Sequence, residues 1–131
     1  IILSLKKMGA SNIILSNRTK KKAEDLKKTF SYVEVIDWGE IPEFNMIINA
    51  TSLGLNEEDK IDLDYKNIGS NKFFYDVIYN PKMTKFLLEA KNFGNQIENG
   101  KMMFIYQAHQ AFTLWHKIMP KIDEETLKLL D

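Results

Sequence analysis

The chain has 131 residues, the size of about one domain, and its 18 basic residues balance its 18 acidic residues. This zero net charge argues against a dedicated nucleic-acid or anionic-membrane binder, because both need a basic excess. The absence of cysteine excludes disulfides, iron–sulfur clusters and cysteine zinc sites, and no apolar run approaches the ~18 residues of a membrane-spanning helix.

The first residues are typical of the second half of a helix rather than of the start of a protein. The apolar residues Ile1, Ile2, Leu5 and Met8 share one helical face, and Gly9 suits the position just after a helix. The chain also lacks an initiating Met. We therefore expect it to be part of a longer protein, with a segment before residue 1.

Downstream, short apolar runs alternate with helical patterns. The runs are continuous, as in strands that are covered on both faces. Strands are predicted over residues 12–16, 33–36, 46–50, 73–78 and 96–98. Helices are predicted over residues 20–30, 84–94 and 100–118, with a last short helix that Asp123 caps and that turns Leu127 and Leu130 inward. Residues 56–70 are expected to be irregular, with one helical turn. This order predicts a doubly wound α/β domain with a parallel sheet.

Ligands of such sheets bind beyond the carboxyl ends of the strands. The first predicted strand is followed by Asn17, Arg18 and Thr19, and residues 17–28 carry six basic and two acidic side chains. Arg18 is the only arginine in the chain. NAD-binding domains usually place a carboxylate here, whereas a guanidinium can hold a 2′-phosphate with two hydrogen bonds. The pattern favours an NADP pocket, and the alternative is a solvated basic helix start.

Two further strand ends carry candidate ligand contacts. The small hydroxylic residues Thr51 and Ser52 follow the strand at 46–50 and would let backbone N–H groups approach a diphosphate or ribose, although an ordinary turn explains them as well. The strand at 73–78 delivers Ile78 and Tyr79 to the same edge. A tyrosine there can either bond a polar substrate or pack half-buried.

The helix predicted over residues 100–118 has three different faces. One face combines apolar residues with two amides, which suit either a ligand or the wet margin of the helix: Met103, Gln107, Gln110 and Leu114. The next face is expected to lie in the core: Phe104, Ala108, Ala111 and Trp115. The third face holds His109 and His116, about 10 Å apart and too far for one metal ion. We expect both histidines at the surface or at an interface, and no metal site.

Four motifs follow one another along the chain. They are Asn17-Arg18-Thr19, the run from Asn49 to Gly54, the run from Asp76 to Pro81, and Asn99-Gly100 followed by Met103 and Gln107-Ala108. Their order and spacing resemble the C-terminal, NADP-binding domain of shikimate dehydrogenase, and the resemblance covers essentially the whole chain. It implies that residues 1–131 form a partial NADP-binding Rossmann domain with C-terminal helices.

The resemblance also implies a role for each matched residue. The adenosine 2′-phosphate would be held by Asn17, Arg18, Thr19 and Lys22. The cofactor groove would be lined by Thr51 and Ser52. The nicotinamide would be positioned by Ile78, the Gly100 carbonyl and Met103. Shikimate would be reached by Tyr79 and Gln107.

The chain departs from the family pattern at two places. Lys22 stands where the family commonly has a second arginine, so the charge is kept and the two-pronged geometry is lost. Lys101-Met102 replaces the Leu-Gly that usually follows Gly100, so the turn into the last long helix is expected to differ. The family's first strand, its Gly-rich diphosphate loop and the substrate domain with the catalytic Lys/Asp pair would all precede residue 1. No catalytic residue is therefore expected within this chain.

The implied reaction is the NADP-dependent reduction of 3-dehydroshikimate to shikimate in aromatic amino-acid biosynthesis, in the cytoplasm. One alternative is a quinate/shikimate dehydrogenase that uses NAD or NADP, and another is a non-catalytic nucleotide-binding regulatory module. The expected partner is the small-molecule substrate, with no nucleic acid or membrane, and a homodimer is compatible with the sequence. Without the family's first strand, which is central in the order 3-2-1-4-5-6, strands 12–16 and 46–50 would have a gap between them. Three outcomes are open: an upstream strand fills the gap, the two strands close it by coming together, or a second copy of the chain packs across it.

Overall fold

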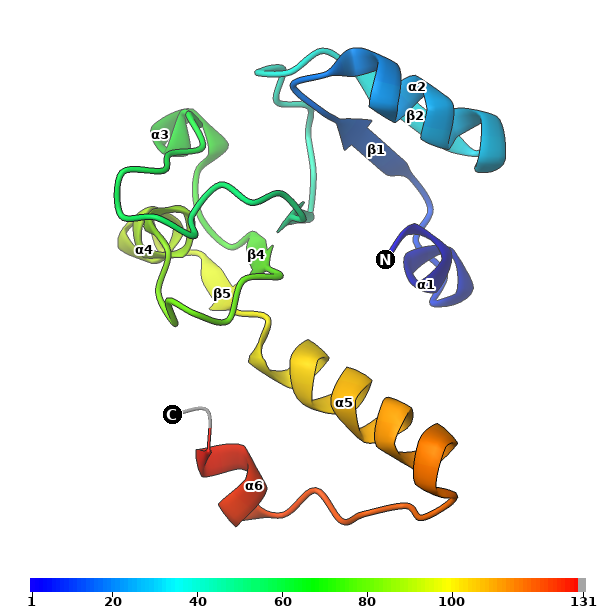
Figure 1. The fold of residues 1–131 in the computed structure, drawn as a ribbon. Coiled ribbons are helices and arrows are strands. Elements are labelled where there is room, and N and C mark those ends of the chain that lie inside the picture. Colours follow the sequence, from blue (N-terminus) through cyan, green and yellow to red (C-terminus); the bar gives the residue numbers. More distant parts are fainter. Residues whose placement is uncertain (130–131) are drawn as a thin grey trace. The chain divides into compact units, whose positions relative to one another are not determined.

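The computed structural model describes residues 1–129, and the chain divides into two compact units, Ile1–Pro42 and Glu43–Asp131 (Figure 1). Both units contain parallel strands joined by crossover connections. Leu130, which the sequence places on the inner face of the last helix, lies outside the described residues.

The first unit is a strand–helix–strand arrangement preceded by a short helix. Its elements are α1 (Ile2–Lys7), β1 (Ile13–Ser16), α2 (Lys20–Thr29) and β2 (Val33–Ile36). β1 and β2 pair in parallel, with Ile13 opposite Val33, and Ala23 of α2 is buried with them. Gly9 follows α1 with a φ of +91°, a left-handed conformation that glycine adopts readily, so the predicted helix stop is confirmed.

The second unit contains a three-stranded parallel sheet in the order β3-β4-β5. Its elements are β3 (Met46–Asn49), α3 (Tyr65–Ile68), β4 (Phe73–Asp76), α4 (Lys85–Asn92), β5 (Gln96–Glu98), α5 (Lys101–His116) and α6 (Glu124–Lys128). The core gathers between the sheet, α3 and α4, and its buried members are Tyr65, Phe74, Phe86, Leu87 and Ala90. The Phe74 and Phe86 ring centroids lie 5.3 Å apart.

The strand and helix order agrees with the sequence prediction, and the parallel pairing is confirmed. β1 and β3 belong to separate sheets, so they do not close the gap by pairing with each other. The fourth strand ends at Asp76, two residues before the predicted end. The reason is local, because the Asp76 side chain accepts a hydrogen bond from the Ile78 backbone N–H and turns the chain out of the ladder.

The prediction that one face of α5 lies in the core is wrong. Ile105 is the buried residue of this helix, whereas Phe104 is 38% exposed and Trp115 is 78% exposed. Apolar periodicity identifies a face that could be buried, but it does not determine which other segment covers that face. His109 is half-buried, and its Nε2 lies 2.8 Å from the Pro120 carbonyl, which ties the helix to the segment that follows.

Candidate functional site

The first cluster of predicted site residues lies between β1 and α2. The Asn17 side-chain oxygen accepts a hydrogen bond of 2.8 Å from the Thr19 backbone N–H, which turns the chain from strand to helix. Thr19 is the N-cap of α2, although its hydroxyl makes no capping hydrogen bond, and its carbonyl accepts from the Lys22 N–H at 2.9 Å. Arg18, at the tip of this turn, is exposed. The four residues predicted to hold a 2′-phosphate thus lie within residues 17–22, between the end of β1 and the first turn of α2.

The electrostatics of this turn favour an anion. The first turn of α2 contains three lysines and no acidic residue, although the positive end of the helix dipole disfavours cations there. Lys20 Nζ lies 2.6 Å from an Asp37 carboxylate oxygen, and this hydrogen bond raises the pKa of Lys20 above its ordinary value. Asp37 directly follows β2 and offsets part of the local positive charge. Counting residues 17–28 alone could not reveal this partner, because it is brought in by the parallel pairing.

The second cluster lies at the carboxyl ends of β3 and β4, where three buried polar side chains meet. Asp76 accepts from Asn49 Nδ2 at 3.0 Å, from the Ile78 N–H at 3.1 Å and from the Thr84 hydroxyl at 2.6 Å. The exposed fractions of Asn49, Asp76 and Thr84 are 3%, 0% and 2%. We call these three residues the carboxyl-edge network. None of the three was predicted to bind a ligand, although Thr84 suits a helix cap and polar residues that end two adjacent apolar strands are a visible signal.

The loop after β3 is braced by the same network. The Asn49 side-chain oxygen accepts from the backbone N–H and the hydroxyl of Thr51, and the Thr51 hydroxyl in turn accepts from the Leu53 N–H. The predicted cofactor contact Thr51 therefore uses its hydroxyl inside the loop, whereas Ser52 is exposed. The far end of the loop is fastened by Asp59, whose pKa is lowered by hydrogen bonds from the backbone N–H groups of Asn56 and Gly54.

The start of α5 is held against the end of β4 by a contact that only glycine permits. The Gly100 N–H donates to the Ile78 carbonyl at 3.0 Å, and the Gly100 carbonyl accepts from the Phe104 N–H at 2.9 Å. A Cβ at Gly100 would overlap the Val77 carbonyl oxygen. A Cβ at Gly54 would lie 3.3 Å from Ile78 Cδ1, so the loop after β3 also approaches Ile78. The predicted contacts at Ser52, Ile78 and Gly100 thus share one edge of the sheet.

The remaining predicted site residues lie on or beside the first two turns of α5. The Tyr79 ring stacks on the Phe104 ring with centroids 4.5 Å apart. Met103 is 38% exposed, and Gln107 is exposed one turn beyond Phe104. Residues three apart on a helix are neighbours, so Gln107 and Tyr79 flank the same phenylalanine. The convergence of their polar ends on one ligand stays a prediction.

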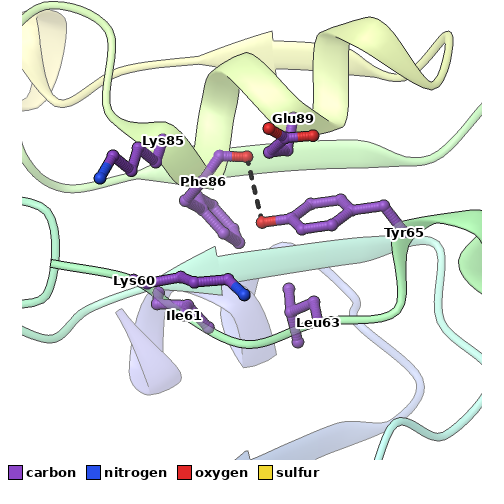
Figure 2. A pocket seen from close by; sticks show the side chains of 7 residues that line it. All are labelled: Lys60, Ile61, Leu63, Tyr65, Lys85, Phe86 and Glu89. Carbon is purple, nitrogen blue, oxygen red and sulfur yellow. Dashed lines mark hydrogen bonds between the residues drawn. The ribbon is translucent and has the colours of Figure 1, made fainter. Parts of the chain in front are cut away.

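A separate cavity of about 320 Å³ opens beside the core of the second unit (Figure 2). Its walls include the core residues Tyr65 and Phe86, and charged side chains such as Lys60 and Glu89 stand at its margin. The Tyr65 hydroxyl points to the Phe86 carbonyl at 3.5 Å, and burial raises the pKa of that hydroxyl. None of the residues predicted to bind cofactor or substrate lines this cavity.

The described residues hold neither a membrane span nor a metal cluster. No helix within residues 1–129 combines the length and the apolarity needed to cross a bilayer. Nor do the residues in that range contain three His, Cys, Asp or Glu side chains grouped so that they could hold a metal ion.

Comparison with known proteins finds that the chain is similar to shikimate dehydrogenases. No protein-family model matches it. The chain is 59% identical over 131 residues to a shikimate dehydrogenase (NADP(+)) of Pelagibacter ubique strain HTCC1062, in an alignment that covers 100% of this chain and 49% of that protein. Among solved structures, it is similar to a shikimate dehydrogenase from Aquifex aeolicus, with 33% identity and a TM-score of 0.85 over 99% of this chain and 47% of that chain.

A second solved structure that is similar to this chain contains bound ligands. The shikimate 5-dehydrogenase of Thermus thermophilus, solved in complex with NADP(H) and shikimate, is 26% identical with a TM-score of 0.82, over 99% of this chain and 48% of that chain. The chain spans about half the length of each of these proteins. The structural likenesses confirm the predicted Rossmann-like α/β fold.

Proposed function

Because the chain is homologous over its whole length to about half of NADP-dependent shikimate dehydrogenase, we propose that it forms the NADP-binding part of an enzyme that reduces 3-dehydroshikimate to shikimate. This reaction is a step of aromatic amino-acid biosynthesis, and we assign it to the cytoplasm, in keeping with the absence of cysteine. The observation that carries the proposal is the turn at the carboxyl end of β1, where Asn17 and Arg18 stand in place of the usual ribose-binding acid.

The residues at this turn fit a 2′-phosphate. Arg18 is exposed and can form two parallel hydrogen bonds to phosphate oxygens, whereas Lys22 offers a single charged group. The first N–H groups of a helix together with its dipole attract anions, so the ten-residue α2 adds to the same preference. A nucleotide phosphate would also relieve the unfavourable placement of three lysines at the positive end of α2.

The second unit supplies the contacts for the reactive half of the cofactor and for the substrate. When bound, NADPH supplies the hydride that converts the ketone to an alcohol. Met103, which is 38% exposed, would provide apolar surface that excludes water, and the buried Ile78 would support it from below. The Gly100 carbonyl keeps a second lone pair for an amide donor. Tyr79 and Gln107 offer a hydroxyl and an amide that can bond the hydroxyl groups of the substrate. The resemblance to the family implies that the groups that transfer the proton lie outside these 131 residues.

The test measures the binding of NADP and of NAD by titration calorimetry in a complete enzyme that contains this chain. Arg18→Ala is expected to weaken NADP binding about ten- to hundredfold, the effect of losing a charge-assisted contact, with little change for NAD. Lys28→Ala is the matched control, because Lys28 lies on the same helix and pairs with Asp25 at 2.6 Å near its other end. Equal losses for NADP and NAD in Arg18→Ala would contradict the assignment.

A second test concerns catalysis by the chain itself. We expect the purified 131-residue chain to show no turnover of shikimate with NADP, because the groups that hold and move the proton are assigned elsewhere. Detectable turnover would place the proton-transfer residues inside this sequence and contradict the carry-over of roles from the family.

A further inference from the structure

We propose that Asp76 is a positioning residue that holds both cofactor-contacting loops of the second unit, the loop 50–54 and the segment 77–79, in one arrangement. The link to NADP rests on the proposed function, whereas the ordering of the loops does not. Asp76 is a buried carboxylate that accepts hydrogen bonds from three neutral donors. These donors are an amide, a backbone N–H and a hydroxyl, and they engage both of its oxygens.

The partners of Asp76 come from three segments of the chain: the end of β3, the residues just after β4 and the N-cap of α4. Asn49 ends β3 and braces the loop that follows through hydrogen bonds to Thr51. Ile78, whose N–H is bound directly, receives the start of α5 through its own carbonyl. Thr84 is the N-cap of α4, and its hydroxyl also accepts from the Leu87 N–H at 3.4 Å. One carboxylate therefore connects both loops to the helix beside them.

Because Asp76 is buried, breaking its hydrogen bonds to these partners costs free energy. A carboxylate removed from water is costly unless each oxygen finds donors, and Asp76 is fully buried. Displacing the segment 77–79 would withdraw the Ile78 donor from Asp76. Rotating the Asn49 side chain, which braces the loop 50–54 through Thr51, would withdraw a second donor. The two loops are therefore expected to move together. Packing reinforces the link, because a Cβ at Gly54 would lie 3.1 Å from Thr84 Cγ2 and 3.3 Å from Ile78 Cδ1.

The opposite end of the same sheet offers a matched control. Asn95 is 7% exposed, and its side chain accepts from the Lys72 N–H at 2.9 Å and donates to the Gly69 carbonyl at 3.0 Å. It thus joins separate segments at the amino ends of β4 and β5, as Asp76 does at the carboxyl end of β4. Neither of these two side-chain hydrogen bonds reaches a predicted site residue.

The experiment compares Asp76→Ala with Asn95→Ala by amide hydrogen exchange in the 131-residue chain. Urea conditions are chosen so that both variants have the same free energy of unfolding. In Asp76→Ala we expect the amides of Thr51, Leu53 and Ile78 to exchange at least about tenfold faster than in Asn95→Ala. Equal protection of these amides in the two variants would show that Asp76 only stabilises the sheet, and would overturn the proposal.

NADP binding is measured by titration calorimetry on the same two variants of a complete enzyme that contains this chain. Asp76→Ala is expected to raise the Kd for NADP about tenfold relative to Asn95→Ala. Faster loop exchange with an unchanged Kd would overturn the positioning role toward the cofactor. If the unchanged complete enzyme does not bind NADP, the proposed function fails, whereas the exchange data still decide whether Asp76 orders the loops.

A second pair of variants covers the case in which Asp76→Ala does not fold. Thr84→Val keeps the methyl group that faces Gly54 and removes only the hydroxyl, whereas Thr84→Ser keeps the hydroxyl. We expect faster exchange of Ile78 and a raised Kd in the valine variant, and recovery of both in the serine variant. Asp123→Ala removes a cap from α6 and controls for the loss of a helix cap. Loss of protection in the serine variant equal to that in the valine variant would overturn the proposal.

Discussion

Gly100 allows a sharp test of how tightly α5 is seated on β4. Its φ of −76° is one that any residue can adopt, so an alanine there would meet no backbone strain. The obstacle is steric. An alanine Cβ would overlap the Val77 carbonyl oxygen and lie 2.5 Å from its carbonyl carbon, whereas ordinary contact begins at 3.4 Å. The helix start must therefore retreat by roughly 1 Å.

That retreat would also break a hydrogen bond. The Gly100 N–H lies 3.0 Å from the Ile78 carbonyl, and a shift of roughly 1 Å exceeds the range of such bonds. Overpacking costs about 1–3 kcal/mol, and an unsatisfied buried donor costs about as much. We expect Gly100→Ala to lower the free energy of unfolding by about 3 kcal/mol, as measured by urea denaturation.

Gly94→Ala is the control for this substitution. Gly94 has a φ of +76°, and the nearest atom to its added Cβ is a Ser70 side-chain carbon at 3.5 Å. The cost there is left-handed strain without a clash, about 1–2 kcal/mol. Gly100→Ala should therefore be the more damaging substitution, although its φ is the ordinary one. If Gly94→Ala proves equally or more destabilising, the close seating of α5 on Val77 is refuted.

Three further predictions address substrate, pH and α5. In a complete enzyme containing this chain, Gln107→Ala should raise the KM for shikimate about tenfold and leave the Kd for NADP unchanged; a parallel change in both would remove Gln107 from the substrate site. Hydrogen bonds from the backbone N–H groups of Asn56 and Gly54 lower the pKa of Asp59. The ionised Asp59 therefore stabilises the fold at pH values above 3.8, the ordinary pKa of the group, and this stabilisation is lost as the pH falls below that value. Asp59→Asn should therefore be less stable than the unchanged chain at about pH 7, with the difference vanishing at acid pH, and denaturation at several pH values checks this. Trp115→Ala should change the free energy of unfolding by less than about 0.5 kcal/mol, because Trp115 is 78% exposed. Phe74→Ala, at a fully buried position, should lower it by about 3–5 kcal/mol. A comparably large loss in Trp115→Ala would show that Trp115 lies in the core after all.

Much of the local structure was predictable because it depends on short-range rules. Gly9 ends α1, Thr84 and Asp123 accept capping hydrogen bonds at the starts of α4 and α6, and the strand at 96–98 has the predicted bounds. Each of these features involves residues within a few positions of one another. The cluster around Arg18 was predictable for the same reason, since one turn of chain holds all its members.

The long-range features required the tertiary structure. Lys20 pairs with Asp37 because parallel pairing sets the ends of β1 and β2 side by side, and no pattern within either segment indicates the ion pair. The carboxyl-edge network likewise joins residues as far apart as Asn49 and Thr84. The sequence pattern indicates the segments that contain these residues, but which of their side chains face inward depends on the packing of other segments against them.

The sequence by itself determined the order of strands and helices, the parallel α/β class and the basic turn that favours a 2′-phosphate, because periodicity, caps and charge act over short stretches of chain. Only the tertiary structure decided that Asp76 is fully buried among three donors and that Gly100 must lack a side chain. It also decided that α5 exposes much of its apolar surface. The physical reason is the same in each case: burial is a relation between segments, and a side chain's role changes with what packs against it.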